Sequence, residues 1–481
     1  MNPQSGLMPS GVPGLDSLLG GGLPTRGIVF VLGAPGTGKT VLLQQLAFAA
    51  ARDGRRALYF SGLSEPHDRL LEHLRPFTFY DEQLVGRGVQ LLSLASTVTE
   101  GSQDAVSTII ATIRETHSQM VLIDGFRGLR NLLGDDAAVL RFLYTLGAQV
   151  GLLRGLLVVA IEGNPRAEGF FPELTTGDLI LGLHFERARI GHRRYIEVLK
   201  RRGAAPLMGL HSFTIDPAGI RCFPQFELTV SRDDTPFDPA RRAPFDLPEL
   251  DALLAGGLTQ RTTTIVVGSP GIGKTMLSLQ FVAAGLARGE PALYVGFRES
   301  RSQLAAKAAA LGLDLAAAVA RGQVQLLTEW PIVFDPDILA HDLRQAITTI
   351  GARRLVIDSL TNLEEALGHE RLEAYLAALA ALLRQQGVTA LITQEAPRVF
   401  GVDLDLARLP LSYLAENVLL LRFVRHRGEL RRILAVLEMR FSEHDRTFHE
   451  FTLDQGQLRV LGRYEGALGL LDALGQRDAA P

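Results

Sequence analysis

The sequence has little of several features that would restrict the class of protein. Its 481 residues include one cysteine, so no disulfide can form within the chain. Apolar runs such as residues 155–161 are far shorter than the roughly 20 residues needed to span a bilayer. The formal net charge is only −3, which excludes a strong general attraction to nucleic acid or anionic membranes. The first residues lack a basic segment followed by an apolar stretch, so we expect a cytoplasmic protein.

One octet of glycine, lysine and threonine occurs twice in the chain. Residues 33–40 read GAPGTGKT and residues 268–275 read GSPGIGKT, each between an apolar β-type run and a helical pattern. This is the context of a phosphate-binding loop, whose backbone N–H groups and following helix form a cradle for anions. The lysine reaches the β- and γ-phosphates in such loops, and the threonine hydroxyl binds Mg²⁺. The residues expected to bind the nucleotide are Gly33, Gly36, Thr37, Gly38, Lys39 and Thr40 in the first loop and Gly268, Gly271, Ile272, Gly273, Lys274 and Thr275 in the second.

The similarity between the two halves extends beyond these loops. At a shift of 235 residues GLDSLLGGGLPTRG (14–27) aligns with ELDALLAGGLTQRT (249–262), and ALYF (57–60) aligns with ALYV (292–295). The chain is therefore a duplication, with an N-terminal domain at 1–230, a linker at 231–244 rich in Pro, Asp and Arg, and a C-terminal domain at 245–481.

Short apolar strands alternate with helical patterns in each half. In the first half we expect strands at 28–32, 57–60, 89–92, 120–124 and 156–161, with helices at 41–52, 67–74, 104–116 and 137–153. Alternating patterns at 178–185, 194–199 and 212–215 predict a β-rich end of the domain. The sequence thus predicts an α/β fold of two tandem P-loop NTPase domains with mostly parallel sheets flanked by helices.

One aspartate ends an apolar strand in each half. Asp124 and Asp358 lie at corresponding distances from the two phosphate loops. Their expected place is the carboxyl edge of the sheet, where the Walker B aspartate of P-loop NTPases holds Mg²⁺. The predicted metal ligands are Thr40, Asp124, Thr275 and Asp358.

Three passages carry a resemblance to a known family. They are GVPGLDSLLGGGLPTRG (11–27) before the first loop, RRYIEVLKRRGAAPLMGLHSFTIDPAGI (193–220), and IDSLTNL (357–363). Together they resemble the KaiC family, double-domain ATPases of the RecA superfamily related to the cyanobacterial circadian clock protein. The resemblance implies RecA-like domains, Mg²⁺ and ATP as cofactors, and a homo-oligomer, a hexameric double ring with ATP between subunits.

The family resemblance also implies catalytic roles. A Glu-Glu pair after the second strand acts as general base in the family, but the matching residues here are Arg298 and Glu299 in the second half. In the first half the matching residues are Leu63 and Ser64, which cannot accept a proton from water near neutral pH. Glu65 lies one residue further on and is an alternative base if the turn is rearranged. Arg298 is expected to favour the charged form of Glu299 and so to weaken it as a base.

A Lys-x-Arg clamp from the neighbouring subunit contacts the γ-phosphate in the family. The first half retains it as Lys200 and Arg202, whereas the second half has Glu438 and Arg440. Without the resemblance, Lys200 and Arg202 would be interpreted as solvated surface charges.

Autophosphorylation in the second domain is a further property of the clock protein. Ser412 occupies the place of one hydroxyl acceptor and is the candidate phosphoacceptor, with an ordinary turn residue as the alternative.

Three functions fit these observations. The first is an ATP-dependent ring that signals through protein partners the sequence does not identify. The second is a scaffold that binds ATP but hydrolyses it weakly, and the third is a RecA-like motor on DNA. The segment after Asp124 mixes Arg127 and Arg130 with acidic residues, and its counterpart (SLTNLEEALGHE) is acidic. Neither resembles the basic, aromatic surface that binds single strands, so nucleic acid is the least favoured partner.

Overall fold

The computed structural model describes residues 6–62, 67–94, 102–166, 172–187, 191–231, 235–329, 334–396, 415–454 and 456–466. The chain divides into two compact units, Met1–Leu228 and Thr229–Pro481.

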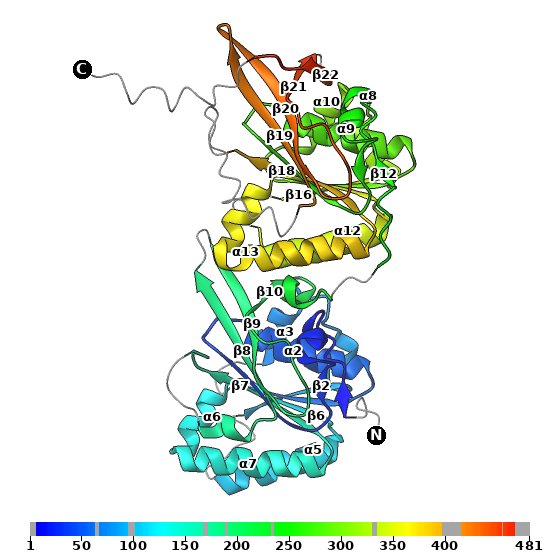
Figure 1. The fold of residues 1–481 in the computed structure, drawn as a ribbon. Helices are drawn as coiled ribbons and strands as arrows, with labels where there is room; N and C mark the ends of the chain where they lie inside the picture. Colours follow the sequence, from blue (N-terminus) through cyan, green and yellow to red (C-terminus); the bar gives the residue numbers. More distant parts are fainter. Residues whose placement is uncertain are drawn as a thin grey trace, which may run out of the picture. The chain divides into compact units, whose positions relative to one another are not determined.

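The first unit contains a mostly parallel sheet between two helical layers (Figure 1). Its strands are β1 (Leu7–Met8), β2 (Leu23–Pro24), β3 (Gly27–Gly33), β4 (Ala57–Ser61), β5 (Val89–Ser93), β6 (Met120–Ile123), β7 (Leu156–Glu162), β8 (Leu179–Arg187), β9 (His192–Arg201), β10 (His211–Asp216) and β11 (Gly219–Phe223). Its helices are α1 (Leu15–Leu19), α2 (Lys39–Arg52), α3 (His67–Leu74), α5 (Ser102–Thr116), α6 (Phe126–Leu133) and α7 (Asp136–Leu152), with 3₁₀ turns η1 (Glu82–Leu84), η2 (Pro172–Thr176) and η3 (Phe226–Leu228).

The sheet of this unit has the strand order β11-β10-β9-β8-β3-β7-β6-β4-β5 within the described residues. The strands from β8 to β5 are parallel, and β8 to β11 form an antiparallel extension. Each face has its own apolar core, one built with α2 and α3 and the other with α5, α6 and α7. Burial on both faces explains why the parallel strands are continuous apolar runs in the sequence.

The second unit repeats this plan. Its strands are β12 (Arg242–Ala243), β13 (Leu258–Thr259), β14 (Thr263–Gly268), β15 (Ala292–Gly296), β16 (Val324–Thr328), β17 (Arg354–Asp358), β18 (Thr389–Glu395), β19 (Asn417–His426), β20 (Glu429–Met439), β21 (His449–Asp454) and β22 (Gln457–Arg463). Its helices are α8 (Pro248–Leu253), α9 (Lys274–Ala287), α10 (Arg301–Ala309), α11 (Leu315–Ala320), α12 (Pro336–Ile350) and α13 (Leu360–Gln385).

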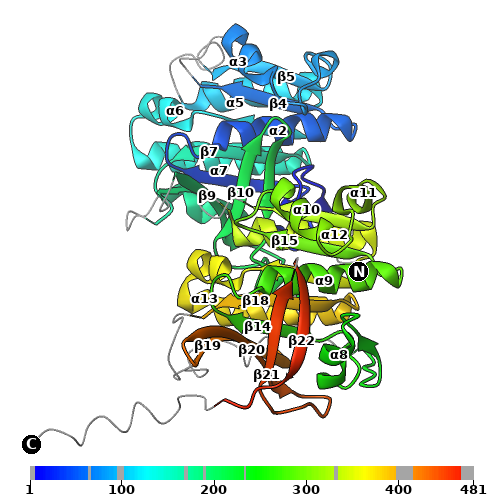
Figure 2. The ribbon, with the colours of Figure 1, turned by 90° about the horizontal axis from the view of Figure 1, so that it is seen from above.

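The second sheet has the strand order β22-β21-β20-β19-β14-β18-β17-β15-β16. Written in this direction, it matches the order of the first sheet strand by strand. Figure 2 shows its antiparallel extension, β19 to β22, beside β14. The predicted class is therefore confirmed: both units have the RecA-like arrangement of a mostly parallel sheet flanked by helices.

The structure adds elements that the sequence did not predict. Residues 126–133, for which no helix was expected, form α6, because Phe126 and Leu129 are spaced for one helix face and are both buried. In the second unit the corresponding region is merged into α13, with non-helical backbone at Gly368. Arg242 and Ala243, assigned to the linker, form β12, which pairs with β13.

Candidate functional site

Both phosphate loops lie at the carboxyl end of a central strand. The first runs from the end of β3 to the start of α2, and the second from the end of β14 to the start of α9. Gly38 and Gly273 have φ values of 108° and 121°, where a side chain is strained. A Cβ atom would also lie 2.7 Å from Ile215 Cδ1 or Leu453 Cδ1, respectively. Only glycine therefore fits beneath the antiparallel extension at these two positions.

The side chains of the two loop lysines bond to backbone carbonyls of their own loops. Lys39 Nζ donates to the carbonyls of Gly33 (2.8 Å) and Ala34 (3.0 Å), and Lys274 Nζ donates to those of Gly268 (2.8 Å) and Ser269 (3.0 Å). Burial lowers the pKa of both amines, and nearby carboxylates oppose that shift. An anion in the loop would offer each lysine a stronger partner than these carbonyls.

The side chains of Thr37 and Ile272 are buried. Thr37 Oγ1 donates to Ala34 O at 2.8 Å, and Ile272 belongs to the apolar core. These two residues can therefore contribute to a phosphate site through their backbone N–H groups, and not through their side chains.

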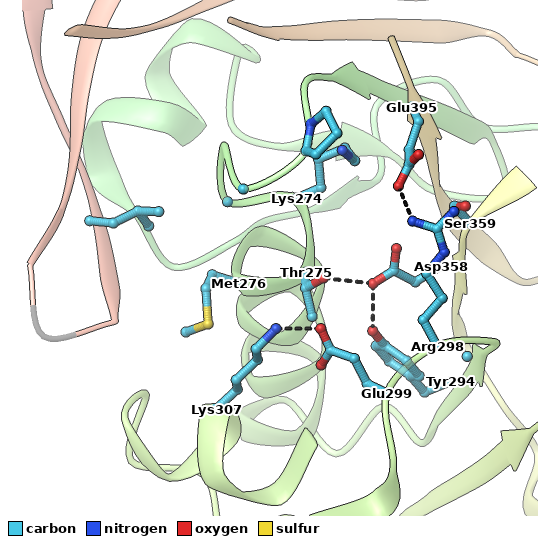
Figure 3. Close-up of a pocket in the computed structure, with 15 residues that line it drawn as sticks. Lys274, Thr275, Met276, Tyr294, Arg298, Glu299, Lys307, Asp358, Ser359 and Glu395 are labelled. Atoms are coloured by element: carbon cyan, nitrogen blue, oxygen red, sulfur yellow. Dashed lines mark hydrogen bonds and ion pairs between the residues drawn. The ribbon is translucent and has the colours of Figure 1, made fainter. Parts of the chain in front are cut away.

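The predicted metal ligands of the second domain are in direct contact. Thr275 Oγ1 donates to Asp358 Oδ2 at 2.8 Å, and Tyr294 Oη donates to the same oxygen at 3.0 Å (Figure 3). Thr393 donates to the other carboxylate oxygen at 2.5 Å. Burial and the Asp358 charge raise the pKa of Tyr294, so its hydroxyl keeps the proton that it donates. Asp358 is thus held as an oriented carboxylate beside the loop threonine, as a Mg²⁺ site requires.

The first domain orients its aspartate in the same way. Tyr59 Oη donates to Asp124 Oδ2 at 2.6 Å. Tyr59 and Tyr294 occupy the same place in the duplicated ALYF and ALYV segments, so the contact is repeated with the sequence. Thr40 follows Lys39 in the first turn of α2.

A pocket of about 340 Å³ surrounds the loop of the second domain. This volume lies within the range of small-molecule sites, about 300–1,000 Å³. Figure 3 shows the side chains that line it. The lining residues are Pro270, Gly271, Gly273, Lys274, Thr275, Met276, Tyr294, Gly296, Arg298, Glu299, Lys307, Asp358, Ser359, Glu395 and Leu453.

Glu299 lies in this pocket but is paired differently from our expectation. Its Oε1 forms an ion pair with Lys307 of α10, while Oε2 is buried and has no hydrogen-bond partner within the part of the chain that the structure describes. Arg298, expected beside Glu299, instead pairs with Glu395 at the end of β18 at 2.5 Å. The cation that neutralises Glu299 is therefore Lys307, which lies in the last turn of α10.

Several predicted residues lie outside the part of the chain that the structure describes. They are Leu63, Ser64 and Glu65 of the first domain and Ser412 of the second.

Lys200 and Arg202 lie at the opposite edge of the sheet from the phosphate loop of their own domain. Lys200 is in register with Ile180, which is in register with Phe30 at the middle of β3. Arg202 donates its backbone N–H to Asp178, which is level with Ile28 at the amino end of β3. Gly33, where the loop begins, is three residues beyond Phe30 along β3, about 10 Å away.

The ends of both clamp side chains are held at that edge. Lys200 Nζ donates to Thr175 O at 2.9 Å. The Arg202 guanidinium is 3.4 Å from Asp178, whose carboxylate also accepts from the backbone N–H of Ile28. The exposed fraction of the Arg202 side chain is 59%, so it is accessible from outside the domain.

The second domain has the same arrangement with an altered charge. Arg440 donates its backbone N–H to Glu416, which in turn bonds to Thr263 at the amino end of β14. Its guanidinium is paired with Glu438 at 3.1 Å. The acid that replaces the clamp lysine therefore also neutralises the remaining arginine.

Sequence reasoning missed several residues in or beside the two loops. Tyr59 and Tyr294 carried a signal, since both recur at the duplication shift. Lys307, Glu162 and Glu395 did not, because only the fold brings α10 and the ends of β7 and β18 to the loops.

The fold and the two loop sites define a tandem P-loop protein with RecA-like domains. Comparison with known families assigns it further: the family model "ATPase: KaiC" matches residues 8–227 and 244–465. The chain therefore belongs to the KaiC ATPase family.

Curated relatives agree with this assignment. The circadian clock protein KaiC3 of Synechocystis sp. is 26% identical over 478 residues, covering 96% of this chain and 93% of the relative. The circadian clock oscillator protein KaiC of Picosynechococcus sp. is 26% identical, covering 92% and 87%, respectively. Among the described residues, none of the helices combines the length and apolar character that a membrane span needs.

Proposed function

We propose that the protein is a Mg²⁺-dependent ATP-binding switch that hydrolyses ATP slowly and assembles into a homo-oligomeric ring, a hexamer, in the cytoplasm. The observation that carries the proposal is the pair of matching sites, each with a loop lysine and an aspartate oriented by a tyrosine. The chemistry of these residues fits a nucleotide with Mg²⁺: backbone donors and a lysine for phosphates, hydroxyl and carboxylate oxygens for the metal.

Binding would use the same groups in both domains. The loop N–H groups and Lys39 or Lys274 would hold the phosphates. Thr40 with Asp124, and Thr275 with Asp358, would hold Mg²⁺, which neutralises charge on the β- and γ-phosphates when bound. Because Lys200 and Arg202 lie at the far edge of their own sheet, they are suited to a nucleotide held by another subunit.

Hydrolysis would come mainly from the second domain. Glu299 would be the carboxylate that accepts a proton from water there, because its buried Oε2 has no hydrogen-bond partner among the described residues. Lys307 pairs with the other carboxylate oxygen of Glu299, and this ion pair would have to be kept or exchanged as water approaches. The first domain, with Leu63 and Ser64 at the corresponding positions, would bind ATP more persistently and maintain the ring.

Signalling would pass through protein partners. Both named relatives are circadian clock proteins, which supports a role in protein-based signalling. Autophosphorylation of Ser412 is a further part of this proposal. A net charge of −3 makes nucleic acid an unfavourable partner.

A second candidate function is an ATP-binding scaffold without appreciable turnover. The contact that favours it is the ion pair between Glu299 and Lys307, together with Glu438 in place of the clamp lysine.

One pair of measurements tests both candidates. Sedimentation at micromolar protein should show a large oligomer with Mg²⁺-ATP and smaller species without nucleotide, since a ligand shared between subunits stabilises the assembly. Phosphate release measured on the same samples separates the switch from the scaffold. A monomer that persists in millimolar ATP would refute the ring, and turnover indistinguishable from a Lys39→Ala/Lys274→Ala double variant would favour the scaffold.

A further inference from the structure

A glutamate lies beside the first glycine of each phosphate loop. Glu162 ends β7 in register with Gly33, and Glu395 ends β18 in register with Gly268. Burial lowers the pKa of the lysine in each loop, and each of these carboxylates is close enough to oppose that shift. A negative charge at this place opposes the binding of a polyphosphate unless a cation compensates it.

An arginine of the same domain pairs with each of these glutamates. Arg127 Nη1 is 3.2 Å from Glu162, and Arg298 Nη1 is 2.5 Å from Glu395. Figure 3 shows the Arg298 guanidinium directed to Glu395, on the side of the pocket where Asp358 lies. Arg298 is also near enough to Lys274 to lower the pKa of that amine.

The two arginines do not correspond to one another in the duplication. Arg127 lies in the first turn of α6, whereas Arg298 follows β15. The shift of 235 residues places Leu63 opposite Arg298, and the shift of 234 residues that aligns β6 with β17 places Thr361 opposite Arg127. The glutamate is thus a repeated feature, but each domain reaches it with an arginine from a different element. A surface ion pair alone gives no reason for the same placement to arise twice.

Both pairs are exposed enough to exchange partners. The exposed fraction of the side chain is 75% for Arg127 and 58% for Arg298. Exposed ion pairs contribute little to stability, so a more highly charged partner can displace the glutamate at small cost. A terminal phosphate offers several anionic oxygens, which a planar guanidinium can bind in a bidentate manner.

In the second domain an arginine of the same subunit would supply positive charge to the terminal phosphate that the clamp supplies less of. Glu438 stands where the family has the clamp lysine, and it pairs with Arg440. Positive charge from a neighbouring chain is therefore reduced at the second site.

We propose that Arg298 binds the γ-phosphate of ATP within its own subunit, resting on Glu395 when the site holds no γ-phosphate, and that Arg127 does the same from Glu162 in the first domain. This inference rests on the proposed ATP binding. It makes the arginine a sensor of the third phosphate, because ADP offers nothing at that place and leaves the ion pair with glutamate intact.

Calorimetric titration of the full-length chain with a non-hydrolysable ATP analogue and with ADP, both with Mg²⁺, tests the proposal. Arg298→Met should weaken analogue binding at one of two sites per chain by about tenfold or more, the loss expected for a charge-assisted hydrogen bond. ADP affinity should change by less than about threefold. Arg127→Met should give the same pattern at the other site.

Glu395→Gln is the matched control, because it breaks the same ion pair from the other side. It should leave analogue binding unchanged or tighter, since it frees Arg298 and removes a negative charge. Equal weakening by Arg298→Met and Glu395→Gln, or equal loss for the analogue and ADP, would show a structural ion pair and overturn the inference. If the wild-type chain binds neither nucleotide, the proposed function falls and the inference with it; if it binds both and Arg298→Met is indistinguishable from it, only the inference falls.

Discussion

Substitution of Arg354 tests whether the buried contacts between β17 and α9 stabilise the second domain. Its side chain is completely buried and ion-paired with Glu290 at 2.6 Å. It also donates to the carbonyls of Pro244 and Phe281, both at 2.8 Å, and lies over the Phe281 ring at 4.5 Å. Arg354 thereby joins β17, which carries Asp358, to α9, which carries Lys274. The corresponding residue of the first domain is Met120.

The perturbation is Arg354→Met, which gives the second domain the residue of the first. Removing one member of a buried ion pair costs about 3–5 kcal/mol, and each buried acceptor left without a donor costs about 1–3 kcal/mol. Two effects reduce the loss. Glu290 is 21% exposed and regains some hydration, and methionine keeps apolar contact with Phe281. We therefore expect the free energy of unfolding of the second domain to fall by about 2–4 kcal/mol.

The assay uses a natural reporter. Trp330 is the single tryptophan of the chain and belongs to the second unit, so its fluorescence during denaturant unfolding should report on that domain. Arg353→Met is the matched control, because Arg353 is the exposed neighbour and should change stability by less than about 0.5 kcal/mol. Adding Glu290→Gln to Arg354→Met should restore part of the loss by removing the stranded charge. A loss below about 1 kcal/mol for Arg354→Met would refute the reasoning.

Three further outcomes follow from the sites. Glu299→Gln should lower phosphate release by about a hundredfold or more, as for loss of a general base, with ATP-dependent sedimentation unchanged; unchanged turnover would point to a base in the first domain. Lys39→Ala should impair ATP-dependent assembly more than Lys274→Ala, measured by sedimentation at equal protein and ATP, and the reverse order would contradict the division of roles. Burial raises the pKa of the Cys222 thiol to about 12 from the ordinary 9.0, so at neutral pH its thiolate fraction is about a thousandfold smaller than in the unfolded chain. Alkylation followed by mass spectrometry should label Cys222 only after unfolding, and rapid labelling of the native protein would show that it is accessible.

Most of the fold could be predicted because the signals are local and repeated. The parallel strands are short apolar runs buried on both faces, and each loop octet follows one of them directly. The places of Asp124 and Asp358 at the carboxyl edge of the sheet could be predicted for the same reason, since the end of a parallel strand fixes them. Residues 126–133 were missed as a helix because eight residues between glycines resemble a loop until burial of Phe126 and Leu129 is known.

The charge pairing inside the site could not be predicted. The expectation that Arg298 neutralises Glu299 used adjacency in sequence, but both residues lie in the bend that follows β15, where adjacent side chains need not share a partner. Arg298 consequently reaches Glu395, and Glu299 reaches Lys307, eight residues ahead and on a helix. Ion pairs between residues this far apart in the sequence depend on how strands and helices pack, and no local sequence pattern predicts that packing.

The placement of Lys200 and the loop of Lys39 at opposite edges of one sheet has a consequence for mixed assemblies. If the clamp of each chain serves the nucleotide of the next, the interface is head-to-tail. In an open assembly one end would have a nucleotide without a clamp and the other a clamp without a nucleotide, whereas a closed ring pairs all of them. A subunit with a defective clamp then impairs the nucleotide site of its neighbour and not its own site. A chain with Lys200→Ala keeps an intact loop, and a chain with Lys39→Ala keeps an intact clamp. Rings that contain both should therefore include complete first-domain sites at half of their mixed junctions, which neither variant can form alone.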